Sequence, residues 1–159
     1  MNFASDNWAG AAPAVMSALA RHNDGFSPAY GTDPLTDSVS ATFNEIFERE
    51  VAVFFVATGS AANSLALASC AKPGGAIFCH SGAHIQVDEC NCPEFMTGGN
   101  KLLSVKGPNG RFSADALREK MAQVPDGVVH HGQVASVSIS LSGQLGLCST
   151  TKPESGSVS

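Results

Sequence analysis

The chain has 159 residues, of which 43% are hydrophobic and 14% are charged. This length suits one domain, but the charged fraction is well below the roughly 25% usual in free-standing soluble domains. We therefore expect much of the surface to meet another subunit or further sequence. A net charge of −5 and an isoelectric point near 5.4 exclude the basic surface that binds nucleic acids or anionic lipids.

No segment predicts a membrane span or a secretion signal. No apolar run approaches the roughly 20 residues of a transmembrane helix. The first residues carry Asp6 without a lysine or arginine, unlike a secretory signal peptide. The cysteines are odd in number and lack the spacing of a disulfide framework, which favours a reducing, cytoplasmic compartment. They are Cys70, Cys79, Cys90, Cys92 and Cys148.

Two helices are predicted in the first third of the chain. Pro13 suits the first turn of a helix that runs to about Arg21, because the N–H that proline lacks needs no partner there. Asp33 is a candidate N-cap for a second helix that begins at Pro34. This second helix has one apolar face, formed at helical spacing by Leu35, Val39, Phe43, Ile46 and Phe47.

From residue 51 onward, strand-like and helical segments alternate. Residues 51–56 (VAVFFV) are a continuous β-branched and aromatic run, which predicts a central strand buried on both faces. Helical composition follows at 60–71. Further strands are predicted at 76–79, 101–105 and 134–139, and further helices at 83–90 and 113–123, the last with Ser113 as N-cap. This alternation is typical of an α/β layer architecture.

A tight turn joins the 51–56 run to the helix that follows. Thr58, Gly59 and Ser60 lie where free backbone N–H groups and the positive end of the helix dipole converge, which suits an anion such as a phosphate. Gly59 lets the backbone approach the anion, and the two hydroxyls are neutral donors. The turn has neither the lysine of a Walker loop nor the glycine spacing of a dinucleotide site. Taken alone, it is also consistent with an ordinary strand-to-helix turn capped by a serine.

His84 is the second candidate site residue. It begins the helix after the 76–79 strand, and ligands of parallel sheets collect beyond the carboxyl ends of the strands. The Thr58–Ser60 turn is expected at the same edge. A histidine there could lie flat on an aromatic cofactor ring or transfer protons. The alternative is a solvated or capping side chain.

These residues form part of an ordered series of motifs that resembles the threonine aldolase and β-eliminating lyase family of fold-type I enzymes, which depend on pyridoxal 5′-phosphate (PLP). The series runs collinearly from about Phe3 to about Ile139, which is more specific than any single motif. Its members are FASDN (3–7), a helix entry with Pro13, Val15, Ala18 and Leu19, YGTDPLT (30–36), FVATGSAAN (55–63), HSGAHIQVDECNCPEF (80–95), TGGNKL (97–102) and VKGPNGRF (105–112).

The resemblance implies roles for individual residues. Thr58, Gly59 and Ser60 would cradle the PLP phosphate. His84 would stack on the pyridine ring and lie near the substrate hydroxyl, and Ser5 would help to fix the substrate carboxylate. As weaker expectations, Tyr30 and Asp33 would lie near the active site and a dimer interface.

The resemblance also implies a fold and a reaction. Residues 1–148 would be the amino-terminal part of the fold-type I large domain, three layers of α/β structure with a mostly parallel sheet. Residues 149–159 are polar, contain proline and glycine and show no periodicity, so their composition, and not the resemblance, predicts a disordered tail. The reaction would cleave β-hydroxy-α-amino acids, such as threonine, allo-threonine and phenylserine-like compounds, to glycine and an aldehyde, with PLP as the electron sink. β-Elimination from aromatic amino acids stays open. The assembly would be a homodimer or homotetramer.

Two groups that this chemistry needs have no counterpart in the chain. Relatives supply a Schiff-base lysine, and an aspartate for the pyridinium nitrogen, downstream of the phosphate turn. No lysine stands in the matching context, and no later core strand could supply the aspartate. The resemblance also decays after the strand near Ile139, where relatives carry a polar, acidic stretch and Gln144 stands roughly where an acid is expected. The lysines are Lys72, Lys101, Lys106, Lys120 and Lys152. We therefore expect an amino-terminal fragment that is inactive alone.

Two functions from other classes remain open. One is a metal-binding module, because several cysteines and histidines cluster within fourteen positions, although they form only one C-x-C pair. The cluster comprises Cys79, His80, His84, Cys90 and Cys92. The other is a non-catalytic dimerising module, which the low charge and apolar helices would suit.

Overall fold

The computed structural model describes residues 8–140. This part of the chain divides between Phe54 and Phe55 into two compact units, and each is described by itself. Ser5, the boundary at residue 148 and the tail at 149–159 lie outside the described residues. No helix within residues 8–140 is long and apolar enough to cross a membrane.

The first unit contains two helices, both at the predicted places: α1 (Pro13–His22) and α2 (Pro34–Ile46). Asp33 caps α2, since its Oδ1 accepts the N–H groups of Leu35 and Thr36 at 3.0 Å. The Thr36 hydroxyl donates to Oδ2 at 2.6 Å. This bond lowers the pKa of Asp33 below its ordinary 3.8. Among the described residues, neither helix has a buried side chain.

The prediction of a buried strand at residues 51–56 is wrong. This segment pairs with no strand within residues 8–140, and Phe54 and Phe55 are 84% and 70% exposed. A strand buried on both faces needs neighbouring strands and a covering layer on each side. The described strands pair only with one another, so the apolar run finds no such surroundings.

The second unit is built on a parallel sheet with the strand order β2-β1-β3. The central strand is β1 (Gly75–His80), with β2 (Lys101–Val105) and β3 (Gln133–Val137) at its two sides. All three were predicted, although β3 ends two residues before the expected Ile139. Phe78 pairs with Leu103 of β2 and with Val137 of β3.

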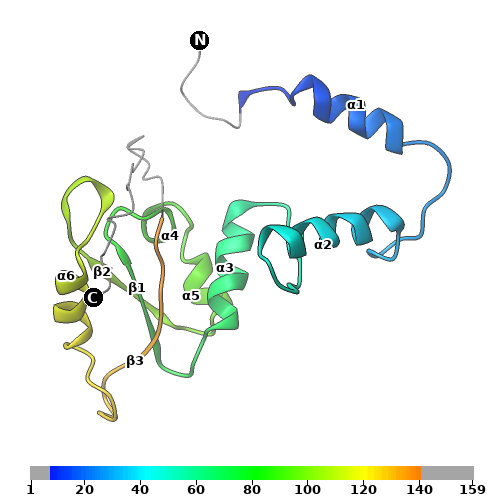
Figure 1. Ribbon diagram of the computed structural model, residues 1–159. Coiled ribbons are helices and arrows are strands. Elements are labelled where there is room, and N and C mark those ends of the chain that lie inside the picture. The colour runs from blue at the N-terminus through cyan, green and yellow to red at the C-terminus, as the bar shows by residue number, and fades with distance from the viewer. Residues whose placement is uncertain (1–7, 141–159) are drawn as a thin grey trace, which may run out of the picture. The chain divides into compact units, whose positions relative to one another are not determined.

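Helices precede β1 and connect the three strands, and they cover both faces of the sheet (Figure 1). Their bounds are α3 (Gly59–Ser69), α4 (His84–Val87), α5 (Cys92–Met96) and α6 (Ala114–Met121), with Ser113 as the N-cap of α6. The helix predicted at 83–90 is thus only one turn long. Cys90 and Asn91 adopt left-handed backbone angles, with φ of 48° and 59°, and such angles cannot continue a helix.

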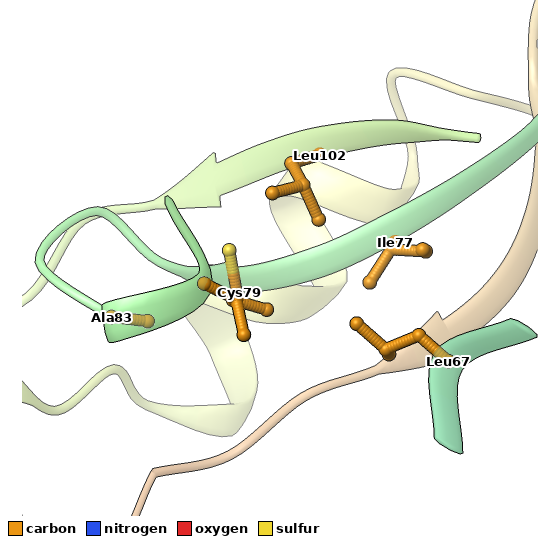
Figure 2. Packing of buried hydrophobic residues seen from close by; sticks show 6 residues of the cluster. Leu67, Ile77, Cys79, Ala83 and Leu102 are labelled. Atoms are coloured by element: carbon orange, nitrogen blue, oxygen red, sulfur yellow. The ribbon is translucent and has the colours of Figure 1, made fainter. Parts of the chain in front are cut away.

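Side chains of β1 alternate between two apolar clusters, one on each face of the sheet. Ile77 and Cys79 pack with Leu67 of α3, Ala83 and Leu102, as Figure 2 shows. Phe78 points to the other face, where residues of α6 such as Leu117 and Met121 cover it. Because a strand has a period of two, one short strand fills both layers. The predicted α/β layer structure with a parallel sheet is confirmed.

Asn100 fixes the turns at the amino ends of β1 and β2. It is 1% exposed, and its Nδ2 donates to the carbonyls of Lys72 at 2.8 Å and of Thr97 at 3.0 Å. Its Oδ1 also accepts the Lys72 N–H at 3.3 Å. A Cβ at Gly75 would overlap Asn100 Oδ1 and would come within 2.9 Å of the Lys72 carbonyl. Only glycine therefore fits where the chain enters β1.

Candidate functional site

The Thr58–Ser60 turn forms the beginning of α3, and Thr58 is its N-cap. Thr58 Oγ1 accepts the Ala61 N–H at 3.1 Å, and its carbonyl accepts the Ala62 N–H at 3.1 Å. Capping by a serine, the alternative from sequence, is therefore not the arrangement found. Within residues 8–140, nothing in the protein accepts from the N–H groups of Gly59 and Ser60.

Packing gives no reason for glycine at position 59. A Cβ built there would meet no described atom within 4 Å, so Gly59 leaves open space directly beside the two free N–H groups. These groups stand at the positive end of the α3 dipole. An anion that approached the turn could accept from both backbone groups, and from the hydroxyls of Thr58 and Ser60. The turn thus has the donors of an anion site.

His84 lies at the first residue of α4, just beyond the carboxyl end of β1, as predicted. Its side chain is 50% exposed. Its Nδ1 lies 2.7 Å from Glu89 Oε1. The same oxygen accepts from Asn63 Nδ2 at 2.7 Å, and Asn63 lies one helical turn after Gly59 in α3. One carboxylate oxygen therefore links His84 to α3, the helix that begins at the predicted turn.

Glu89 is an unusual member of this network because its side chain is fully buried. Its second oxygen, Oε2, has no hydrogen-bond partner among the described residues. Burying a carboxyl group costs free energy unless hydrogen bonds offset the loss of water. Oε1 has two hydrogen-bond partners, Asn63 of α3 and His84 of α4, and these contacts hold Glu89 in place.

Sequence reasoning assigned no role to Asn63 or Glu89. Asn63 carried a weak signal, since it is a polar residue one turn into a helix of small and apolar residues. Glu89 carried none, because its partners Asn63 and His84 come from two separate helices. Only the folded arrangement shows that these two side chains meet.

The cysteine and histidine cluster has structural contacts and does not form a metal site. No group of three or more His, Cys, Asp or Glu residues within residues 8–140 could hold one metal ion. Burial, together with the charge of Glu94, raises the pKa of the Cys79 thiol to about 11, so Cys79 is protonated at neutral pH. Cys92 accepts a hydrogen bond from Ser64 at 3.2 Å.

His80 joins two loops at the carboxyl edge of the sheet. Its Nδ1 accepts the Gly82 N–H at 3.0 Å. Its Nε2 therefore carries the proton in the neutral ring and donates to the Gly107 carbonyl at 3.0 Å. At Gly107 a Cβ would overlap the Arg111 carbonyl, so the two ends of the loop 107–111 touch. Both ring nitrogens of His80 are thus occupied by structural bonds.

The other predicted site residues are placed only in part. Ser5, Gln144 and Lys152 lie outside the described residues. Tyr30 and Asp33 belong to the first unit, and Asp33 is used as the cap of α2. Among residues 8–140, no lysine is hydrogen bonded to the Thr58–Ser60 turn or to His84. Within the described part of the chain, one lysine ammonium group donates to a backbone carbonyl, Lys72 Nζ to Val134 at 3.2 Å.

The fold and the site define an α/β protein with a candidate ligand site at the carboxyl ends of its parallel strands. The chain belongs to the beta-eliminating lyase family, whose sequence pattern matches residues 2–148. Members of this family generally depend on PLP. The match confirms the resemblance predicted from the motifs.

Two curated relatives are low specificity L-threonine aldolases from Pseudomonas sp. (strain NCIMB 10558) and Pseudomonas aeruginosa. Each is 35% identical over 144 residues, which cover 91% of this chain and 41% of the relative. The chain thus spans less than half the length of these relatives. A solved structure of Leishmania major threonine aldolase shares the fold with a TM-score of 0.79 at 22% identity, over 87% of this chain and 40% of that one.

Proposed function

We propose that the chain contributes the phosphate-binding turn and an active-site histidine to a PLP-dependent lyase of the threonine aldolase type. The whole protein would cleave β-hydroxy-α-amino acids such as threonine, allo-threonine and phenylserine-like compounds to glycine and an aldehyde. The observation that carries the proposal is the pair of free N–H groups at Gly59 and Ser60. They begin the helix whose Asn63 is linked through Glu89 to His84. Family membership supports the choice of cofactor.

The residues of the turn fit a phosphate. Two backbone N–H groups and two hydroxyls can donate to its oxygens, and the α3 dipole adds a favourable field. Thr58 Oγ1 uses a lone pair to cap α3, which leaves its O–H free to donate. The space beside Gly59 is open to the ligand. The donors are neutral, so they would hold a phosphate group without a covalent bond.

Each of the proposed site residues would have a distinct role. PLP supplies the electron sink for cleavage of the carbon–carbon bond. Thr58, Gly59 and Ser60 would bind its phosphate, and the half-exposed ring of His84 would cover the pyridine ring and take the proton from the substrate hydroxyl at Nε2. Ser5, which lies outside the described residues, would orient the substrate carboxylate.

We extend the proposal to the assembly and to the isolated chain. The whole enzyme would be a homodimer or homotetramer in the cytoplasm, with no nucleic-acid or membrane partner. The 159-residue chain would bind PLP reversibly and would have no lyase activity by itself, because none of its lysines has the sequence context of the Schiff-base residue. β-Elimination from an aromatic amino acid is the second reaction that the family supports.

A titration with PLP tests the phosphate turn. We expect saturable binding to the 159-residue chain and at least ~10-fold weaker binding to Gly59→Asp, because a carboxylate would repel the phosphate. Gly10→Asp is the matched control, since Gly10 is exposed and has no atom within 4 Å of its Cβ position. It should bind as the unchanged chain does. Equal affinity of Gly59→Asp and Gly10→Asp would refute the proposed turn.

Borohydride reduction after addition of PLP tests the prediction about the lysines. We expect no stoichiometric adduct at any single lysine, and mass spectrometry of the digested chain would show this. A specific, complete adduct at one position would show instead that the chain holds its own covalent attachment site.

A further inference from the structure

We propose that Glu89 is a positioning residue that fixes the tautomer and orientation of His84, and that Asn63 in turn fixes the orientation of Glu89. The inference deepens the proposed function and rests on it for the role of His84 in the reaction. Its physical basis lies in the hydrogen bonds from Asn63 and His84 to one oxygen of Glu89.

The direction of these hydrogen bonds follows from the chemistry of the partners. An amide nitrogen such as Asn63 Nδ2 can only donate, so Glu89 Oε1 must be an acceptor. With Glu89 as a carboxylate, Oε1 has no proton to donate, so the contact between Oε1 and His84 Nδ1, at 2.7 Å, needs a proton on Nδ1. In a neutral imidazole only one nitrogen carries a proton, and Nε2 then has the free lone pair.

This tautomer is the one that the proposed reaction needs. A free lone pair on Nε2 lets His84 accept a proton from a substrate hydroxyl. The ring is half exposed, so Nε2 can meet a ligand, while Nδ1 faces a fully buried side chain. With both partners of Glu89 Oε1 in place, the ring cannot rotate by half a turn without losing a charge-assisted bond. Glu89 thus favours one tautomer and one ring orientation of His84 over the alternatives.

The hydrogen bonds of Glu89 also link the positions of the two parts of the site. Asn63 stands in α3, one turn after the free N–H groups of the Thr58–Ser60 turn. Glu89 follows α4, the short helix that His84 begins. The buried carboxylate therefore ties the orientation of the histidine to the helix whose N-terminus would hold the phosphate. A purely packing role would not need an acceptor, since methionine fills a similar volume.

Glu89→Met and Glu89→Gln separate positioning from packing. The full chain is labelled with ¹⁵N-histidine, His84 is assigned with His84→Gln, and long-range ¹H–¹⁵N spectra of the neutral rings are recorded at about pH 9. We expect the Nδ1–H form in the unchanged chain. Glu89→Met should lose it in favour of Nε2–H, and Glu89→Gln should retain it because its amide oxygen still accepts.

Asn63 is tested in the Glu89→Gln background, where the fold is least disturbed. With Asn63 present, the oxygen of the introduced side-chain amide is held toward both donors. In the double variant Asn63→Ala/Glu89→Gln this amide is free to turn its NH₂ group toward Nδ1, so we expect a substantial loss of the Nδ1–H signal. Asp88→Asn is the matched control, because Asp88 is an exposed acid next to Glu89 that is outside the network. It should leave the spectrum unchanged.

The outcomes distinguish this inference from the proposed function. Two results would overturn the positioning role whether or not PLP binds. One is an Nε2–H form of His84 in the unchanged chain, and the other is an unaltered tautomer in both Glu89→Met and the double variant. Loss of PLP binding alone would refute the proposed function and leave the spectra to decide the role of Glu89. The positioning role also predicts that PLP binds more weakly to Glu89→Met than to Glu89→Gln.

Discussion

The two units of the chain contain helices of similar length but differ in what supports them. In the first unit, α1 and α2 begin with proline, α2 has a well-made cap at Asp33, and no side chain of either helix is buried within the described residues. In the second unit, α3 and α6 pack on a sheet whose central strand is almost fully buried. Local signals determine where helices start, whereas burial depends on partners far away in the sequence.

The difference teaches how an apolar pattern should be interpreted. Residues 51–56 are as apolar as β1, yet Phe54 is 84% exposed and Phe78 is fully buried. The amino acids are the same in kind, and only the neighbouring strands differ. An apolar run of this type indicates that the segment tends to be buried, but it does not indicate which part of the protein covers it.

The largest expected effect comes from truncating the same residue type in the two environments. Phe78→Ala should lower the free energy of unfolding by ~3–5 kcal/mol, because it empties space on a buried face of the sheet. Phe54→Ala should change it by less than about 0.5 kcal/mol. Urea unfolding followed by circular dichroism measures both. A large loss in Phe54→Ala would show that residues 51–56 are buried in solution and would break the comparison.

A smaller effect is expected from adding one methyl group to a glycine in each unit. Gly75→Ala should cost ~1–3 kcal/mol, because its Cβ would overlap the buried side chain of Asn100. Gly10→Ala meets open space and should be neutral within about 0.5 kcal/mol. The melting temperatures of the two variants give the contrast. Equal values would mean that the turn around Asn100 can relax.

The smallest effect concerns the helix caps. Asp33→Ala should speed amide exchange in α2 about fivefold, because the cap is its main support, and Ser113→Ala should change exchange in α6 less, because α6 also packs on the sheet. The pKa of Asp33 is lowered below 3.8, so its capping is complete above that pH and is lost as pH falls through the lower folded value. Asp33→Ala should remove this pH dependence. Equal exchange rates in α2 and its variant at neutral pH would refute the role of the cap.

Much of the fold was accessible from the sequence because its signals are local. Proline at the start of α1, Asp33 before α2 and Ser113 before α6 mark helix starts through atoms only a few residues apart. The three paired strands were recognised from their short apolar composition. The failure at residues 51–56 and the shortened α4 have another origin, because strand pairing and left-handed bends depend on contacts that periodicity does not encode.

The candidate site was likewise predicted only where its signals are local in the sequence. Thr58 to Ser60 and His84 carry their signal in the turn itself and in its position after a strand. Glu89 acquires its place only when α3 and α4 come together, since its partners Asn63 and His84 lie 26 and 5 positions away. A carboxylate that acts through another side chain therefore leaves no local trace in the sequence.

The loop 107–111 offers a practical route for labelling the protein. Its two ends touch at Gly107 and Arg111, and His80 fastens the first of them to the β1 edge. Asn109 at its tip is exposed and takes part in no described hydrogen bond. Because the ends of the loop are held together, a change at its tip need not move them. A short peptide inserted after Asn109 would therefore extend into solvent without displacing β2 or α6. A fluorophore or affinity tag placed there would report on the chain while leaving the carboxyl edge of the sheet undisturbed.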